Sequence, residues 1–163
     1  MIPAIVRPLR SLRFSSVMAA VVVTLVLSPV VAFAQIKVDG SGISKVGHET
    51  RKLTVDAKAS AGGAPTGTVR FIYNSPAGLT RFRGTVNCLR VSGGTAQVSG
   101  VIDKGETATG GLLDGKAFAF TITTATSPQT FSLPNYADAG GIAACSGGRP
   151  ETVPVTEDGF HLN

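Results

Sequence analysis

The most informative stretch of this chain for its fold is Gly84-Thr-Val-Asn-Cys-Leu-Arg-Val-Ser-Gly-Gly-Thr-Ala-Gln-Val-Ser-Gly-Val-Ile102. Gly93 and Gly94 stand at its centre. A two-residue hairpin turn of the favoured mirror-image type needs φ > 0 at both central positions, which glycine reaches without steric cost. The flanks are rich in Val, Leu, Ile and Thr, residues that suit a pleated strand. The stretch therefore predicts a β-hairpin with Cys88 buried in its first arm.

The face pattern of this hairpin predicts something about its surroundings. A turn at the two glycines places Cys88 opposite Ser99 and Leu89 opposite Val98. Side chains alternate between the two faces of a strand, so the apolar residues change face between Cys88 and Leu89. Either both faces of the arm are covered, or a bulge near Cys88 switches the face. A central strand of a two-layer sandwich allows both.

The first 34 residues are typical of a secretory signal peptide. A start with three arginines precedes the apolar run from Val17 to Leu27, and Ala32-Phe33-Ala34 forms a small-x-small cleavage site before Gln35. The alternative is a retained membrane anchor, for which the apolar stretch is barely long enough. We therefore expect residues 1–34 to be a signal peptide, residues 35–163 to be one domain, and the mature protein to be secreted without a membrane span.

Cleavage would change the charge and the composition of the chain. Of 15 basic residues three leave with the signal, so the net charge falls from +5 to 12 − 10 = +2. A nucleic-acid partner is not supported by so small an excess. All 20 glycines stay, and the chain has no Trp. This composition favours many short strands and turns over helices.

Alternating apolar and polar residues predict the other strands. The clearest is 51–59, where Leu53, Val55, Ala57 and Ala59 share one face. The full set of predicted strands is 36–39, 51–59, 68–73, 80–91, 95–102, 116–124, 130–133 and 159–162. Residues 40–50, 60–67 and 103–115 are predicted as connections, and 135–155 as irregular. The fold class is therefore all-β, an antiparallel β-sandwich or small barrel of about six to eight strands.

Cys88 and Cys145 are the two cysteines of the chain. In an exported protein a disulfide between them is the default, and it would tie the hairpin to the irregular C-terminal segment. The alternative is a redox-active or nucleophilic cysteine. The chain has no Cys-x-x-Cys, and neither His48 nor His161 stands in a recognisable partner context.

Arginines concentrate in the predicted strands and mark the candidate ligand-binding residues, which are Arg70, Arg81 and Arg83. If residues 74–79 close a hairpin, Phe71 faces Phe82 and Arg70 faces Arg83. Like charges directly opposite each other cost stability. An anionic partner such as an acidic glycan, a teichoic polymer or a lipid head group would compensate for that cost. The alternative is a solvated strand face.

Other candidate groups have ordinary structural interpretations. Asp103, Glu106 and Asp114 share one predicted loop and would bind a cation only loosely, and ordinary turn chemistry is the favoured explanation for them. His48 and His161 lack metal-ligand spacing, so no metal site and no cofactor are predicted. Tyr73, Phe71 and Phe82 would form a sugar-stacking face, but an all-β core needs such aromatics first.

The hairpin resembles a loose family of small exported bacterial proteins, most familiar from actinobacteria, that share Gly-Thr-Val-x-Cys-Leu-x-Val-Ser-Gly. The resemblance extends weakly from Leu53 through Thr124. It implies a single all-β domain and no particular activity, because none is assigned to the family. Many members have an Asp-Asn-Gly turn after the strand that corresponds to 118–123. This chain has Thr124-Ala-Thr-Ser-Pro128 there, so no role of that turn is carried over.

These observations favour an exported, disulfide-stabilised binding or structural module without catalytic machinery. Its expected partner is an anionic cell-envelope polymer or another exported protein. The alternative is a small secreted hydrolase or metal-dependent enzyme, which would need some of Asp103, Asp114, His48 and His161 to meet in a cleft. A secreted structural subunit, marked by an uncovered apolar edge, is a third possibility.

Overall fold

The described part of the chain is built from antiparallel strands. The computed structural model describes residues 35–60 and 63–163, and the predicted signal peptide lies outside them. The strands within these ranges are β1 (Ile36–Val46), β2 (Glu49–Ala59), β3 (Thr66–Ser75), β4 (Gly78–Ser92), β5 (Thr95–Glu106), β6 (Ala117–Thr123), β7 (Thr130–Ser132), β8 (Asn135–Ala137), β9 (Thr152–Pro154) and β10 (Glu157–Leu162). The predicted all-β antiparallel class is confirmed. In residues 35–60 and 63–163 we find no helix long and apolar enough to cross a membrane.

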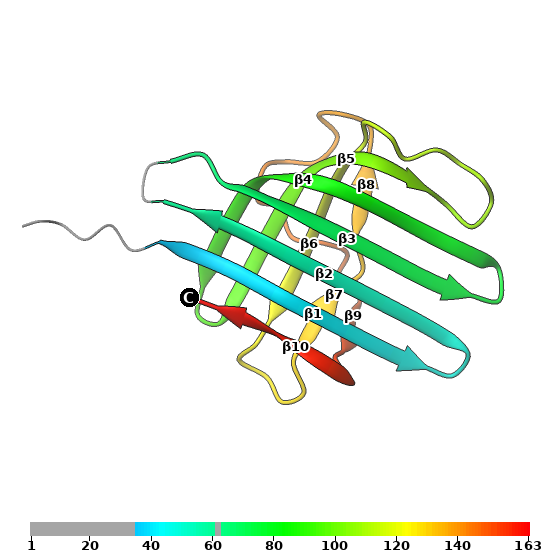
Figure 1. The fold of residues 1–163 in the computed structure, drawn as a ribbon, viewed down its shortest axis with the longest axis horizontal. Coiled ribbons are helices and arrows are strands. Elements are labelled where there is room, and N and C mark those ends of the chain that lie inside the picture. Colours follow the sequence, from blue (N-terminus) through cyan, green and yellow to red (C-terminus); the bar gives the residue numbers. More distant parts are fainter. Residues whose placement is uncertain (1–34, 61–62) are drawn as a thin grey trace, which may run out of the picture. The chain divides into compact units, whose positions relative to one another are not determined.

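All the strands belong to one sheet that curls into a half-barrel. The order is β10-β1-β2-β3-β4-β5-β6-β7-β9, and β8 pairs with β6 beside β7. Figure 1 shows β1 to β4 in front and β6 to β9 behind them, with β4 and β5 passing from one layer to the other. The two layers of the predicted sandwich are therefore two parts of a single sheet. The described residues form ten strands rather than six to eight, because the segment 135–155 contributes the short strands β8 and β9.

Several strands exceed their predicted bounds by one or two residues at an end, and two of them, β1 and β5, extend further for a shared physical reason. β1 continues to Val46 through residues predicted as a connection, and β5 continues to Glu106 through residues predicted as a loop. The buried inward positions of these extensions are Gly42 and Ser44 on β1 and Gly105 on β5, and none of them carries an apolar signal. A Cβ on Gly42 would meet the ring of Phe160, and one on Gly105 would meet Phe82. Glycine stands at these positions because an aromatic side chain fills the space, and this hides the alternation from sequence reasoning.

The central hairpin is formed as predicted. Gly93 and Gly94 have φ of 57° and 75° and connect β4 to β5. Cys88 pairs with Ser99, and the register shifts between Val86 and Cys88, so the bulge is present. Ser99 is buried, because the C-terminal segment covers this part of the sheet on its second side. Cys88, predicted to be buried, is half-buried. Both alternatives that the face pattern left open therefore occur together.

Aromatic side chains fill the concave side of the sheet. Phe71 contacts Phe82 at 5.6 Å between ring centroids, and Phe82 contacts Phe118 at 5.7 Å. The ring of Phe118 lies against Gly84 and Gly100, where an added Cβ would come within 2.8 Å of it. Two glycines side by side on β4 and β5 thus leave room for one ring, and the sheet closes tightly around it.

The disulfide between Cys88 and Cys145 holds the C-terminal segment onto the hairpin. The Cα atoms of the two cysteines are 5.2 Å apart. The Cys145 amide donates to the hydroxyl of Ser99 at 3.0 Å, and the Gly148 amide donates to the hydroxyl of Thr121 at 3.3 Å. The predicted pairing is confirmed, and because both sulfur atoms are in this bond, neither cysteine is a free thiol.

Gln129 joins the ends of the curled sheet. Its side-chain amide donates to the Phe160 carbonyl at 3.1 Å, and its side-chain oxygen accepts from the Phe160 amide at 2.8 Å. The backbone carbonyl of Gln129 also accepts from the Val155 amide at 2.8 Å. The Gln129 side chain therefore replaces a neighbouring strand at this position. It provides hydrogen-bond partners for the backbone amide and carbonyl of Phe160 on the free edge of β10.

Candidate functional site

Three cationic side chains form a row across the outer face of the sheet. Arg70 on β3 pairs in register with Arg83 on β4, and Arg83 pairs with Lys104 on β5. All three residues are exposed. We call Arg70, Arg83 and Lys104 the cation row. Neighbouring strands lie about 4.8 Å apart, so the row spans about 10 Å.

The predicted pairing of Arg70 with Arg83 is confirmed, and Lys104 extends it. Sequence reasoning missed Lys104 because the residue falls in a stretch predicted as a loop, where strand register cannot be counted. The one available signal was the pair of polar residues, Lys104 and Glu106, on either side of Gly105. A glycine at the inward position gives no apolar signal, so the alternation of a strand was not recognisable there.

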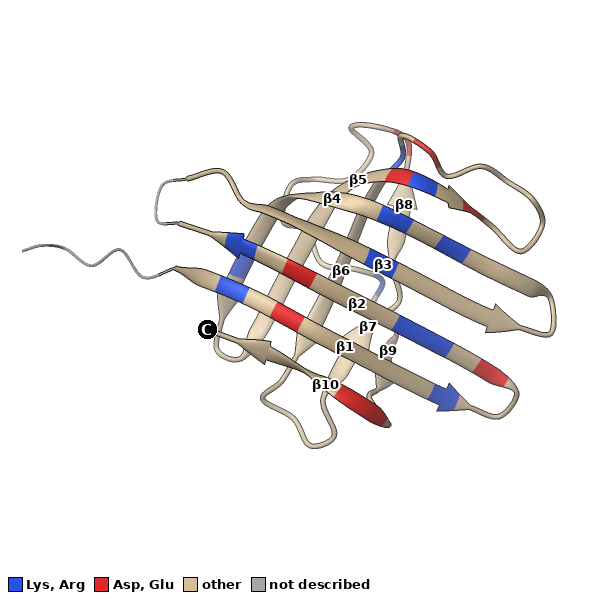
Figure 2. Ribbon diagram, in the orientation of Figure 1, with Lys and Arg blue, Asp and Glu red and all other residues tan. Residues whose placement is uncertain are grey.

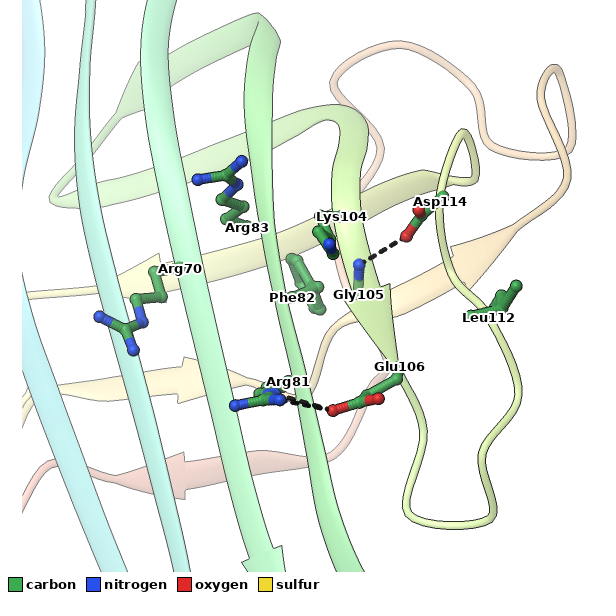
Figure 3. Close-up of a pocket in the computed structure, with 9 residues that line it drawn as sticks. All are labelled: Arg70, Arg81, Phe82, Arg83, Lys104, Gly105, Glu106, Leu112 and Asp114. Atoms are coloured by element: carbon green, nitrogen blue, oxygen red, sulfur yellow. Dashed lines mark hydrogen bonds and ion pairs between the residues drawn. The ribbon is translucent and has the colours of Figure 1, made fainter.

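The cation row makes no ion pair with any side chain in residues 35–60 and 63–163, whereas the third predicted arginine does. Arg81 contacts Glu106 through Nε and through a terminal nitrogen, each at 2.8 Å (Figure 3). Its guanidinium is therefore already engaged by a carboxylate. Among Arg70, Arg81 and Arg83, the structure leaves the first and the third available for a ligand.

The cation row lies between two hollows in the outer face. The first, of about 570 Å³, is shown in Figure 3. It is lined by Arg70, Arg81, Phe82, Arg83, Lys104, Gly105, Glu106, Leu112 and Asp114. The second, of about 360 Å³, shares Arg70 and Arg83 and includes Asp56 and Asp103. A ligand seated in either hollow would contact guanidinium groups, which bind carboxylate and phosphate oxygens in a bidentate way.

The acids near the cation row have structural partners. Asp103 accepts from the Thr85 hydroxyl at 3.1 and 3.2 Å, and Asp114 accepts from the Gly105 amide at 2.8 Å. Glu106 is the partner of Arg81. The predicted shared loop is therefore wrong for Asp103 and Glu106, which lie on β5 and have cross-strand partners. Only Asp114 lies in the loop and bonds to a backbone amide, as turn chemistry predicts. No group of three potential metal ligands occurs within the described ranges.

The two histidines lie apart from this site, and the aromatic residues Phe71 and Phe82 are buried in the core beneath it. His48 lies in the turn between β1 and β2, and His161 lies on β10 opposite Asp39. Both are separated from Asp103 and Asp114, which belong to β5 and the loop after it. Phe71 and Phe82 are 3% exposed and belong to the core, so they offer no sugar-stacking face.

Tyr73 points inward and belongs to a polar cluster at one end of the core. Its hydroxyl donates to Glu49 at 2.8 Å, and the guanidinium of Arg51 lies 4.8 Å from its ring centroid. Arg51 is 7% exposed and forms an ion pair with Glu49. Burial, followed by the hydrogen bond to Glu49 and the charge of that carboxylate, raises the pKa of Tyr73 above its ordinary value of 10.0.

Comparisons with protein-family models, with curated proteins and with solved structures find no significant match for this chain. The candidate site is therefore argued from its geometry and charge.

Proposed function

We propose that this protein is an exported, non-catalytic binding module that holds an anionic ligand of the cell envelope or the extracellular medium on its cation row. The supporting observation is the register of Arg70, Arg83 and Lys104, which face solvent side by side without ion-pair partners among the described side chains. Adjacent like charges repel one another, and a bound polyanion offsets this repulsion because it attracts all three cations.

Two further observations support parts of this proposal. The disulfide is typical of proteins that fold in an oxidising compartment, in agreement with export. The two histidines that a hydrolytic or metal-dependent alternative would need lie on β10 and in the β1–β2 turn, at least three strands from β5 in the order of the sheet. A binding role therefore agrees better with the arrangement of charged groups than a catalytic one.

The test measures the affinity of the mature, oxidised protein for polygalacturonate, a soluble carboxylate polymer, at low and high ionic strength. The variant Arg70→Gln/Arg83→Gln/Lys104→Gln should bind at least about tenfold more weakly, because each charge-assisted hydrogen bond contributes about 1.5–3 kcal/mol. Its affinity should also depend less on salt, since fewer charges are in contact with the polymer.

The matched control is Lys37→Gln/Lys45→Gln/Lys58→Gln, which removes the same charge from β1 and β2 of the same sheet. We expect this variant to bind nearly as well as the wild type. An equal loss of affinity in both triple variants would mean that net charge, and not the cation row, attracts the polymer. Unchanged affinity in the cation-row variant would refute the proposed function.

A further inference from the structure

Exposed apolar side chains gather at one end of the sheet. In the described part of the chain four large apolar residues are clearly exposed, and three of them are Val46 (51%), Leu79 (40%) and Leu112 (73%). We call these three the apolar tips. Val46 precedes the β1–β2 turn, Leu79 follows the β3–β4 turn, and Leu112 lies in the loop after β5. These two turns and this loop all lie at the same end of the sheet, on the right in Figure 1.

The three apolar tips are spread along this end of the sheet, with Val46 at an inward position of β1 and Leu79 at an outward position of β4. The Ala108 amide donates to the hydroxyl of Thr80 at 3.0 Å, so the loop that carries Leu112 is attached beside Leu79. Val46 lies three strands away, on β1. With about 4.8 Å between strands, the tips occupy a line of roughly 15 to 20 Å.

The outer face behind the tips is cationic and partly apolar. One cross-strand row of that face reads Ile43, Lys52, Ile72, Arg81 and Glu106, so apolar and cationic residues alternate along it until the acid at its end. The cation row follows two residues further from the tips. The acids Asp39 and Asp56 face each other nearer the opposite end of β1 and β2, as Figure 2 shows.

An apolar rim next to unpaired cations is the pattern of a surface that binds a membrane interface. Apolar side chains enter the boundary between head groups and acyl chains, while Lys and Arg meet the phosphates of anionic lipids. A soluble polyanion would satisfy the cations but would leave the apolar tips in water. The cations and the apolar tips together fit one ligand, which carries both anionic and apolar groups.

We propose that the anionic partner is the surface of a lipid bilayer that contains anionic head groups, and that Val46, Leu79 and Leu112 insert into its interface. This inference rests on the proposed function for the role of the cation row, and it adds the class of ligand. The protein then docks on its β1–β2 and β3–β4 end, with the outer face inclined toward the lipid.

The test is co-sedimentation of the mature protein with vesicles of phosphatidylcholine alone and of phosphatidylcholine mixed with phosphatidylglycerol. The wild type should bind the mixed vesicles and bind the neutral ones much less. The variant Val46→Ser/Leu79→Ser/Leu112→Ser should partition onto the mixed vesicles at least about tenfold more weakly, because it loses apolar groups that insert. The double variant Val46→Ser/Leu79→Ser, which leaves the hollow lined by Leu112 intact, should keep the wild-type affinity for polygalacturonate.

Single variants protect this test against a folding defect. Leu112→Ser changes a loop residue that is 73% exposed, and Val101→Ser is its matched control. Val101 is the fourth exposed apolar residue, 40% exposed on β5 away from the tips. Leu112→Ser should weaken vesicle binding and Val101→Ser should not. An intact disulfide by mass and a wild-type circular dichroism spectrum verify the fold of each variant.

The possible failures are distinguishable. If the triple tip variant binds mixed vesicles as the wild type does, the lipid inference is wrong, while binding of polygalacturonate through the cation row is unaffected. The same holds if neutral vesicles bind as strongly as mixed ones, because head-group charge would then have no role. If the cation-row variant binds polygalacturonate like the wild type, the proposed function itself fails, whatever the vesicles show.

Discussion

At the scale of single residues, glycines on β4 and β5 determine how tightly the sheet curls. Gly84 and Gly100 leave space for the ring of Phe118, which reaches the aromatic group of Phe71 and Phe82. An added Cβ on Gly100 would come within 2.8 Å of that ring and would also meet the carbonyl oxygen of Thr85. Backbone cannot move aside as a flexible side chain does, so this space is constrained on two sides.

We therefore expect Gly100→Ala to lower the free energy of unfolding by about 1–3 kcal/mol, the usual cost of overpacking a core. Urea denaturation measures this change. Gly63→Ala is the control, because a Cβ there would meet its nearest atom at an ordinary 3.5 Å. Equal effects of the two substitutions would contradict the role assigned to the Phe118 ring.

Tyr73 gives the core a dependence on alkaline pH. Its pKa is raised by burial and by Glu49, so the phenol stays neutral in the folded state at a pH where the unfolded chain begins to ionise. Stabilisation from the raised pKa is complete below pH 10.0, the ordinary pKa of Tyr, and is lost as the pH rises through the folded-state pKa.

The matching prediction compares the wild type with Tyr73→Phe by urea denaturation across alkaline pH. Below pH 10 the wild type should be more stable by about 1 kcal/mol, the typical net value of a hydrogen bond. That difference should shrink as the pH rises further. Tyr136→Phe removes a phenol elsewhere and serves as the control. A difference between the wild type and Tyr73→Phe that stays constant with pH would contradict the interpretation.

At the scale of elements, the β4–β5 hairpin supports a segment that has little apolar content of its own. Residues 138–151 form no strand, and their contacts with β5 and β6 include the hydrogen bonds to Ser99 and Thr121. The Cys88–Cys145 disulfide closes a loop of 57 positions and holds this segment in place. A cross-link over a loop of this length restricts the unfolded chain considerably.

Replacement of both cysteines, as Cys88→Ala/Cys145→Ala, should lower the free energy of unfolding by about 2–4 kcal/mol. In this variant, amide hydrogen exchange should accelerate most at residue 145 and at Gly148, whose backbone amides donate to Ser99 and Thr121 in the wild type. The reduced wild type is the matched control and should behave in the same way. Faster exchange confined to β1–β3 would show that the disulfide does not anchor the C-terminal segment.

At the scale of the whole molecule, the candidate site exists only because three strands lie in register. Arg70, Arg83 and Lys104 are separated by 13 and 21 positions in the sequence, yet they are direct cross-strand neighbours. The pairing of the two arginines could be predicted from the turn between their strands. The position of Lys104 could not, because β5 continues beyond Ile102 only through Gly105 packed against Phe82.

The position of the apolar tips also could not be predicted from the sequence, because these residues are even further apart along the chain. Val46 and Leu112 are far apart in the sequence, and neither belongs to an alternating pattern that would mark it as exposed. They lie at one end of the molecule because β1 and β5 both end there. The proposed contact with lipid is thus a property of the assembled sheet.

The strand class, the β4–β5 turn and the partners of the disulfide could be predicted from residue order alone, because they depend on local alternation, on two adjacent glycines and on a cysteine count of two. The folded chain was needed to show that one sheet supplies both layers, that Gln129 joins its ends, and that the cation row contains Lys104. These features depend on contacts between distant residues, such as Phe160 over Gly42. The residues that neighbour a glycine in the sequence do not indicate which distant side chain will pack against it.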